Sequence, residues 1–221
     1  MIIDERMVTY INSLDTGHTP FLENLERTAK QDRVPIIRRE MQSFLKVFLK
    51  MKQPKRILEV GTAVGFSAAF MAQYGEPDAE ITTIENYEKR IPIARENFKK
   101  SGFADRITLI PGDAAEVLKT LDGPYDFIFM DAAKGQYIHF LPEVLRVLDK
   151  NGVLITDNVL QDGDVIESRF AVERRNRTIH KRMREYLFEL THNEGLLTSV
   201  VPLGDGIAIT MKSHEKREET T

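Results

Sequence analysis

Apolar residues in the first fifty positions recur with the spacing of an amphipathic helix. The clearest stretch carries them at intervals of one to three positions: Met41, Phe44, Leu45, Phe48 and Leu49. The pattern is interrupted between Gly17 and Pro20 and again at Pro35. Because glycine and proline interrupt helices, the chain from Glu5 to Met51 is predicted to form two or three helices.

After Pro54 the pattern changes to short apolar runs that are typical of β-strands. These runs are rich in β-branched and aromatic residues and cover 56–61, 80–85, 107–110, 125–131 and 152–157. Helical periodicity fills the intervals at 65–73, 87–101, 113–121 and 137–148. This alternation indicates a doubly wound parallel sheet that is covered by helices on both faces.

The end of the chain departs from this alternation. Two strand-like runs, 196–203 and 207–212, are joined by Gly204-Asp205-Gly206. An Asp-Gly pair between apolar runs is a hairpin signal, so the final strands should be antiparallel. The fold class predicted is α/β: a Rossmann-like, doubly wound, seven-stranded sheet with a C-terminal antiparallel strand and N-terminal helices.

Composition indicates one domain and excludes several kinds of chemistry. A chain of 221 residues, 42% of them hydrophobic, is expected to form a single domain, with a helical cap at 1–53, a core at 54–212 and a disordered polar tail at 213–221. It has no cysteine, which excludes disulfides and thiolate ligands. No leader-like or 20-residue apolar segment is present, so we expect a cytoplasmic protein without a membrane span.

A glycine-containing loop follows the first predicted strand and reads Glu59-Val-Gly61-Thr-Ala-Val-Gly65. It lacks the third glycine of a nicotinamide-dinucleotide site, which disfavours a dehydrogenase. Glu85 ends the second strand, where a carboxylate accepts hydrogen bonds from ribose hydroxyls. Asp113 follows the third strand, in place to hold an adenine. Plain strand-to-helix geometry explains the loop equally well by itself, but the combination favours S-adenosylmethionine, which has no phosphate.

Oxygen-bearing side chains follow the fourth and fifth predicted strands. Asp131 ends one strand and Asp157-Asn158 ends the next. Because the carboxyl ends of adjacent parallel strands meet at one edge of a sheet, the three side chains should lie together as a hard-cation site that suits magnesium. Lys134, three residues after Asp131, is placed to act as a base. The alternative is that these residues only cap loops.

Four ordered motifs closely resemble those of the cation-dependent O-methyltransferases, the family of catechol and caffeoyl-CoA O-methyltransferases. They are Glu-Val-Gly-Thr-Ala-Val-Gly-Phe-Ser, Asp-Ala-Ala-Lys-Gly-Gln-Tyr, Ile-Thr-Asp-Asn-Val-Leu and Pro-Leu-Gly-Asp-Gly. The similarity runs from about Val34 to Lys212. It implies a class I S-adenosylmethionine-dependent methyltransferase that uses Mg²⁺ or another divalent cation and forms a homodimer.

The resemblance also implies a role for individual residues. Asp131, Asp157 and Asn158 would bind the cation, and Lys134 would be the base beside Asp131. The implied cofactor-binding residues are Met41, Glu59, Gly61, Ser67, Glu85, Asp113, Ala114 and Asp131. The family's catechol enzymes place an aromatic residue just after the metal aspartate, whereas this chain has Ala132 and Ala133. That departure argues against a catechol substrate.

A basic segment, residues 169–184, is hidden by the net charge of −3. It holds seven basic residues and the single acid Glu173. Helical spacing places Arg174, Arg177 and Lys181 on one face, with Arg175 and Arg182 close by. Such a run is usually a solvated helix face, but beside a catalytic mouth it would attract a polyanion. Arg38 and Arg39 are predicted to extend the same surface.

Within the family these features resemble bacterial tRNA 5-hydroxyuridine methyltransferases, through Lys-Gln-Pro-Lys, Asp-Ala-Ala-Lys-Gly-Gln-Tyr and Thr-Asp-Asn-Val-Leu. The resemblance implies methylation of 5-hydroxyuridine to 5-methoxyuridine at the wobble position, with the tRNA anticodon stem-loop as partner. Exposed loop bases are accessible without melting a duplex. The alternatives are O-methylation of a small catechol or phenol, and a non-catalytic S-adenosylmethionine-binding module, which would have no need of a metal and a base.

Overall fold

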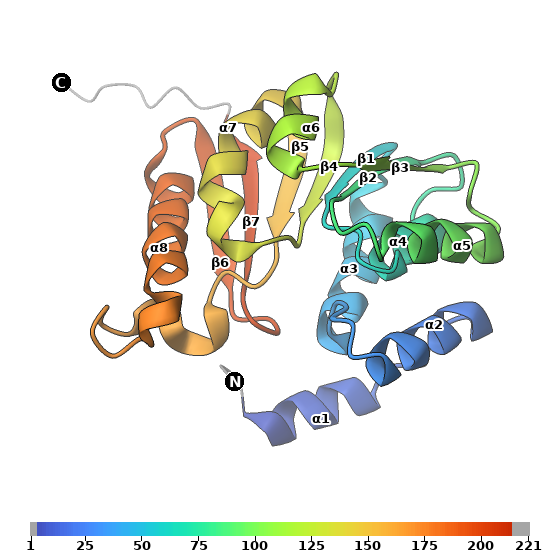
Figure 1. Cartoon of the computed structure of the whole chain (residues 1–221), viewed down its shortest axis with the longest axis horizontal. Coiled ribbons are helices and arrows are strands. Elements are labelled where there is room, and N and C mark those ends of the chain that lie inside the picture. Colours follow the sequence, from blue (N-terminus) through green and yellow to red (C-terminus); the bar gives the residue numbers. More distant parts are fainter. Residues whose placement is uncertain (1–3, 214–221) are drawn as a thin grey trace. The chain divides into compact units, whose positions relative to one another are not determined.

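The computed structural model describes residues 4–213 and shows an α/β fold (Figure 1). Seven strands form a mixed sheet in the order β3-β2-β1-β4-β5-β7-β6, which confirms the predicted fold class. The described chain groups into two compact units, which we call the N-terminal unit (4–121) and the C-terminal unit (122–213). Most of the predicted tail at 213–221 lies outside the described residues.

The N-terminal unit consists of six helices and three parallel strands in its described part. In chain order they are α1 (Glu5–Ser13), α2 (Pro20–Gln31), α3 (Arg39–Lys52), β1 (Arg56–Val60), α4 (Phe66–Tyr74), β2 (Glu80–Glu85), α5 (Ile91–Ser101), β3 (Ile107–Pro111) and α6 (Ala114–Thr120). The three N-terminal helices confirm the prediction for residues 5–51. The predicted helix at 87–101 starts late, at Ile91, with Pro92 in its first turn, a position that proline favours.

Helix α4 is the centre of this unit, because it packs against α2, α3, α5, β2 and β3. Six of its nine residues are buried, including Phe66, Phe70 and Met71. A helix that is apolar on most sides is stable in water only when neighbours cover it. The packing of α2 and α3 on α4 explains why the compact unit extends past the predicted cap boundary at residue 53.

The C-terminal unit contains four strands, two α-helices and three short 3₁₀ turns in its described part. They are β4 (Tyr125–Met130), η1 (Lys134–Gln136), α7 (Tyr137–Val147), β5 (Leu148–Thr156), η2 (Gln161–Ile166), η3 (Arg174–Asn176), α8 (Arg177–His192), β6 (Leu196–Val201) and β7 (Ile207–Lys212). β4 and β5 are parallel, whereas β7 is antiparallel to both β5 and β6. The predicted antiparallel end of the sheet is therefore confirmed.

Helix α8 packs on β6, α7 and the three 3₁₀ turns (Figure 1). Arg174 lies in the 3₁₀ turn η3, which leads directly into α8 at Arg177, so the predicted helical run of Arg174, Arg177 and Lys181 spans two elements. The chain turns at Glu173, whose carbonyl accepts a hydrogen bond from the Asn176 amide at 2.8 Å. Strand β6 also ends earlier than predicted, at Val201, because Pro202 has no amide to donate to the sheet.

None of the helices described between residues 4 and 213 has the length and apolar character needed to cross a membrane.

Gly65, just before α4, should be hard to replace with any other residue. Its φ is +83°, and an added Cβ would lie 2.5 Å from Cε1 of Phe98, a ring that is only 3% exposed. Gly102 is the matched control, since its φ is +78° but a Cβ there meets nothing within 4 Å. Both alanine variants carry strain of about 1–3 kcal/mol, and Gly65→Ala adds a clash of about 1–3 kcal/mol.

We expect urea unfolding to show a lower free energy of unfolding for Gly65→Ala than for Gly102→Ala. Equal losses of unfolding free energy in the two variants would show that the Phe98 ring adds no clash at position 65.

Candidate functional site

The loop between β1 and α4 is held by the neighbouring strand. The amides of Gly61 and Thr62 both donate to the carbonyl of Ile84 at 3.1 Å. At the other end of the loop, Asn97 Nδ2 donates to the Val64 carbonyl at 2.8 Å. Gly61 has a φ of +109°, a conformation that costs glycine little. The predicted cofactor loop is therefore an ordered turn at the carboxyl end of β1.

Glu85 ties the end of β2 to this loop. Its Oε2 accepts a hydrogen bond from the Ala63 amide at 2.7 Å, and its Oε1 accepts one from the Tyr87 amide at 2.8 Å. The side chain is 8% exposed. A carboxylate accepts about two hydrogen bonds at each oxygen, so Glu85 retains lone pairs for a ligand hydroxyl. Its predicted ribose contact stays a prediction.

Glu59 is 0% exposed and lies below the loop. Thr83 Oγ1 donates to its Oε2 at 2.5 Å, and the Thr83 and Thr62 hydroxyl oxygens are 2.5 Å apart. This chain of polar contacts links β1, β2 and the loop. The structure thus gives Glu59 a supporting position beneath the loop.

The remaining predicted cofactor residues also belong to the N-terminal unit. Asp113 is exposed and caps α6, accepting a hydrogen bond from the Ala115 amide at 2.8 Å. Ala114 is the first residue of α6, and Ser67 is half-buried in the first turn of α4. Met41 is 1% exposed on α3. Their contacts with a cofactor stay predictions.

Asp131, Asp157 and Asn158 come together in the C-terminal unit. Met130 pairs with Thr156 in the parallel β4–β5 register, and the Asp157 amide continues the ladder by donating to the Met130 carbonyl at 2.9 Å. Asn158 then turns with a φ of +63°, and its Nδ2 donates to Asp131 Oδ1 at 2.7 Å. The adjacency predicted from the strand ends is present.

The pKa values of the Asp131 and Asp157 carboxyl groups are both raised. Burial raises the pKa of the Asp157 carboxyl to about 7, and the neighbouring Asp131 carboxylate adds to that rise. Burial also raises the pKa of Asp131, while Lys134 and the hydrogen bond from Asn158 oppose the change. Two like charges removed from water repel each other strongly, so this pair of side chains favours a bound cation.

Tyr137 braces the strand ends from within the core. It is 0% exposed, and its hydroxyl lies 3.2 Å from the Ala132 carbonyl and 3.3 Å from the Asp157 carbonyl. The Ala132 amide donates to the same hydroxyl oxygen. Burial raises the pKa of Tyr137 well above its ordinary value, which keeps the hydroxyl protonated. Tyr137 therefore holds the turns after β4 and β5 together.

Lys134 has a partner that the sequence analysis did not identify. Its Nζ donates to Asp205 Oδ2 at 2.8 Å, and Asp205 is 3% exposed. Asp205 Oδ1 accepts a hydrogen bond from the Asp162 amide. The sequence signal was the Gly-Asp-Gly motif, which we interpreted as a hairpin turn and as part of a family motif, without assigning a role to Asp205. Because β7 pairs antiparallel to β5, the start of β7 lies at the carboxyl end of β5, beside the candidate site.

The basic segment divides into cations that hold the backbone and cations that face water. Arg177 donates to the carbonyls of Val172 and Phe170, Arg182 donates to the Gly135 carbonyl at 3.0 Å, and Arg184 donates to the Val165 carbonyl. Gly135 immediately follows Lys134. Arg182 therefore ties the basic segment to the turn that carries the predicted base.

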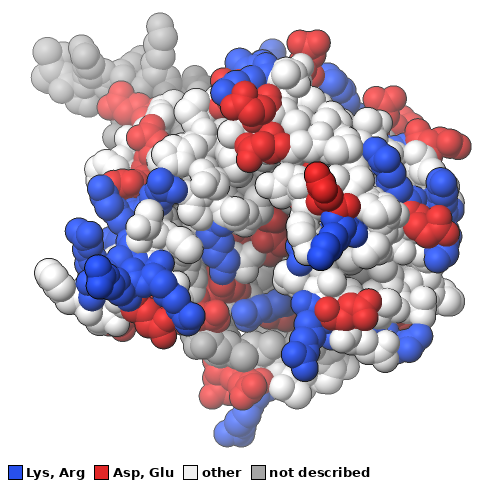
Figure 2. All heavy atoms as spheres, viewed as in Figure 1, with Lys and Arg blue, Asp and Glu red and all other residues white. Residues whose placement is uncertain are grey.

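Arg174, Arg175 and Lys181 are exposed. Two of them pair with carboxylates at the surface: Arg175 lies 2.7 Å from Glu173, and Lys181 lies 3.5 Å from Glu185. Figure 2 shows Lys and Arg side chains gathered on one face over the start of α8 and the loop before it. Exposed pairs of this kind are weak, so these cations are available to a polyanion.

Arg38 and Arg39 belong to the N-terminal unit. Arg38 is exposed. Arg39 makes ion pairs with Glu26 at 2.7 Å and Glu23 at 3.0 Å, and the hydrogen bond to Glu26 raises the pKa of Arg39 most. Two carboxylates offset the charge of Arg39, which makes it a weaker candidate for phosphate binding than the exposed arginines.

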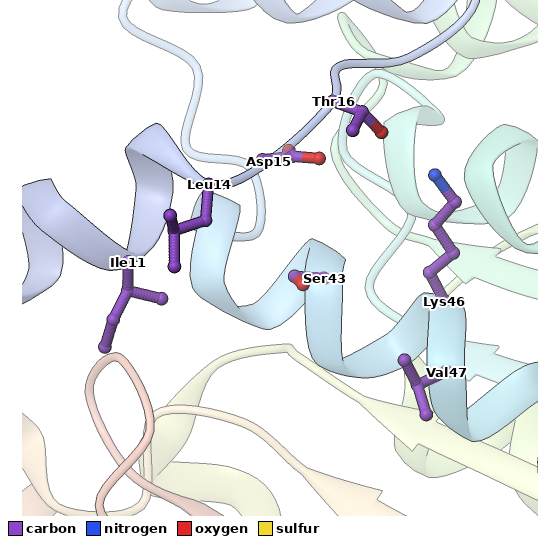
Figure 3. Close-up of a pocket in the computed structure, with 7 residues that line it drawn as sticks. All are labelled: Ile11, Leu14, Asp15, Thr16, Ser43, Lys46 and Val47. Atoms are coloured by element: carbon purple, nitrogen blue, oxygen red, sulfur yellow. The ribbon is translucent and has the colours of Figure 1, made fainter.

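A pocket of about 330 Å³ lies between α1, the residues that follow it, and α3, and none of its lining residues is among those predicted to be functional. It is lined by Ile11, Leu14, Asp15, Thr16, Ser43, Lys46 and Val47 (Figure 3). Figure 3 shows the side chains of Ile11 and Leu14 on one side and those of Ser43, Lys46 and Val47 on α3. The pocket is open and mixed in polarity, and none of its residues belongs to the site described above.

Comparison with known proteins matches residues 12–213 to the O-methyltransferase family. The chain belongs to this family. A catechol O-methyltransferase of Mycobacterium tuberculosis is 30% identical over 160 residues, which cover 71% of this chain and 73% of that protein. Caffeoyl-CoA O-methyltransferase 1 of Eucalyptus globulus is 29% identical, over 86% of this chain and 80% of the relative.

Solved structures agree with the assignment to the O-methyltransferases. A candidate caffeoyl-CoA O-methyltransferase of Staphylococcus aureus has a TM-score of 0.88 and 32% identity, and covers 95% of this chain and 100% of that one. A Podospora anserina methyltransferase with bound S-adenosylhomocysteine has a TM-score of 0.86 and 28% identity, over 95% and 94%. The protein is an S-adenosylmethionine-dependent O-methyltransferase.

In this methyltransferase, the chemistry needs an acceptor oxygen in line with the cofactor's methyl group. Direct transfer of this kind depends mainly on orientation. The C-terminal unit contains Lys134, whose Nζ donates to Asp205, and the N-terminal unit contains the glycine loop and Glu85.

Replacing Glu85 with glutamine should weaken S-adenosylmethionine binding. The uncharged amide would lose the charge-assisted hydrogen bond to the predicted ribose hydroxyl, at a cost of about 1.5–3 kcal/mol. Titration calorimetry should then show a Kd about tenfold to hundredfold higher. Glu88→Gln, on the exposed stretch after β2, is the control and should bind like the parent. Parental affinity in Glu85→Gln would refute the cofactor role of Glu85.

Proposed function

We propose that this O-methyltransferase uses Mg²⁺ and methylates 5-hydroxyuridine to 5-methoxyuridine at the wobble position of tRNA. The observation that supports an RNA substrate most directly is the bond from Arg182 to the Gly135 carbonyl. This bond and the packing of α8 on the Lys134–Gln136 turn join the helix that carries the exposed Lys181 to the turn that carries Lys134. A small neutral phenol has no use for a surface of exposed cations, whereas an anticodon loop presents both phosphates and an exposed base.

The donor set of the C-terminal unit fits a magnesium ion. Within residues 4–213, no three His, Cys, Asp or Glu side chains form a group suited to a metal. The proposal therefore includes the side chain of Asn158, which contacts Asp131, as a third ligand. Asp131 and Asp157 are the other two. Carboxylate and amide oxygens are hard ligands, and a cation would relieve the repulsion between the buried Asp157 carboxylate and the half-buried Asp131 carboxylate.

When bound, a divalent cation orients the acceptor oxygen and stabilises its deprotonated form. The chain's own residues do the remainder. In this proposal Lys134 Nζ receives the proton of the acceptor hydroxyl, and its hydrogen bond to Asp205 holds the side chain in place. Tyr137 fixes the turns that carry Asp131 and Asp157. An enolic hydroxyl of 5-hydroxyuridine and a phenolic hydroxyl are chemically alike in this step, so substrate choice depends on the surface around the site.

The second candidate is O-methylation of a small catechol or phenol. The name of the Mycobacterium tuberculosis relative favours it. Ala132 and Ala133, which follow Asp131 in this chain, argue against a catechol, because the family's catechol enzymes place an aromatic residue there. The two candidates share their chemistry and differ in whether the exposed cations contribute.

Asp157→Asn should lose metal binding and methyl transfer together. The substitution keeps the shape of the side chain but removes one of two anionic ligands, so we expect the Kd for Mg²⁺ to rise at least about tenfold. S-adenosylmethionine affinity should stay within about twofold. Asp149→Asn, at the opposite end of β5, is the matched control. Full turnover of the parent enzyme in excess EDTA would exclude the metal role.

Removing the exposed cations should abolish the RNA preference. We expect the triple variant Arg174→Ala, Arg175→Ala, Lys181→Ala to bind an anticodon stem-loop more weakly and with a flatter salt dependence, by up to about 0.9 in slope for each lost contact. Melting temperature and S-adenosylmethionine affinity should stay near the parent values, because surface substitutions cost about 0.5 kcal/mol or less.

The control is a triple variant of exposed lysines in the N-terminal unit, Lys50→Ala, Lys99→Ala, Lys100→Ala. Methylation of a stem-loop that contains 5-hydroxyuridine is measured by nucleoside mass spectrometry. If both triple variants methylate the stem-loop as well as the parent does, methylation of a small phenol becomes the better-supported function.

A further inference from the structure

Phe170 lies in the middle of the basic segment and is 86% exposed. Phenylalanine is among the residues most often buried, and an isolated exposed one needs no explanation. This one is immediately preceded by Arg169 and followed within five residues by Arg174 and Arg175, all exposed. An apolar ring among cations matches one kind of partner well: a polyanion that also carries flat rings.

The backbone around Phe170 is ordered even though its ring is not covered. The amides of Ala171 and Val172 both donate to the Ser168 carbonyl, at 3.0 and 3.3 Å. Val172 is 4% exposed, so it anchors the turn in the core. Arg177 donates to the carbonyls on both sides of Ala171. The ring is therefore presented by a fixed turn, which reduces the entropy lost when it orders against a ligand.

Helix α8 connects this turn with the candidate site. His180 Nε2 lies 3.1 Å from the Glu167 carbonyl, and Arg184 donates to the Val165 carbonyl at 3.1 Å. Arg182, on the same helix, donates to the carbonyl of Gly135. One helix thus holds both the turn that carries Phe170 and the turn that carries Lys134, within the same compact unit.

We propose that Phe170 is a base-stacking residue, which packs against an unpaired base of the RNA loop while the neighbouring arginines bind its phosphates. This inference rests on the proposed function. Aromatic side chains stack on bases of any sequence, so Phe170 contributes affinity and orientation, and the catalytic centre selects the hydroxyl. An acidic protein would use the same cations but would gain nothing specific from an aromatic ring.

The test is binding of an anticodon stem-loop RNA to the full chain as the salt concentration varies. Phe170→Ala should raise the Kd about tenfold and leave the slope of log Kd against log salt unchanged, because no phosphate contact is lost. Arg175→Ala should flatten that slope. Phe170→Trp should keep the parental affinity. Phe170→Leu, which is apolar without being aromatic, should lose affinity as Phe170→Ala does.

The matched control is Phe188→Ala, which removes a ring that is 59% exposed at the other end of α8. It should bind RNA like the parent. As a direct readout, 2-aminopurine placed next to the wobble position should be less quenched in complex with Phe170→Ala than with the parent.

The outcomes separate the two proposals. If the parent neither binds nor methylates the stem-loop, the proposed RNA function fails and the role of Phe170 fails with it. If the parent methylates the stem-loop and Phe170→Ala or Phe170→Leu binds it with parental affinity, the RNA function stands and the stacking role is overturned.

Discussion

The parallel pairing of β4 and β5 is the constraint on which the candidate site depends. Because Met130 pairs with Thr156 and the Asp157 amide extends the ladder to the Met130 carbonyl, two carboxylates leave the sheet side by side. They are largely removed from water, and their pKa values rise as a consequence. The fold therefore holds an arrangement of like charges that is unfavourable by itself. A cation at this edge would relieve that repulsion, and the proposed function relies on this relief.

A second consequence follows from the antiparallel end of the sheet. Insertion of β7 between β5 and β6 brings Asp205 to the same edge, where it fixes Lys134. Helix α8 then braces the unit with side chains that donate to backbone carbonyls, among them Arg177, Arg182 and Arg184. A run of cations that looks uniform in the sequence is therefore divided into structural residues and surface residues, and only the second kind is available to a substrate.

Most of the fold was predictable because its signals are local. β2 and β7 have the predicted limits, and the three N-terminal helices begin and end near the predicted glycines and prolines. The adjacency of Asp131 to Asn158 was also predictable, since parallel strand ends meet at one edge of a sheet. The pairing of Lys134 with Asp205 was not, because the residues are 71 positions apart and hairpin chemistry alone explains a Gly-Asp-Gly turn.

The sequence by itself determined the order of strands and helices, the glycine loop, the oxygen-rich strand ends and the presence of a basic segment, because periodicity and residue type decide these. The tertiary structure decided which charges are buried, which are paired and which face water. It showed Glu59 beneath the loop, Arg39 between two glutamates, and α8 starting only at Arg177. The reason is physical: burial and pairing depend on neighbours that are distant in the chain, and no local pattern records them.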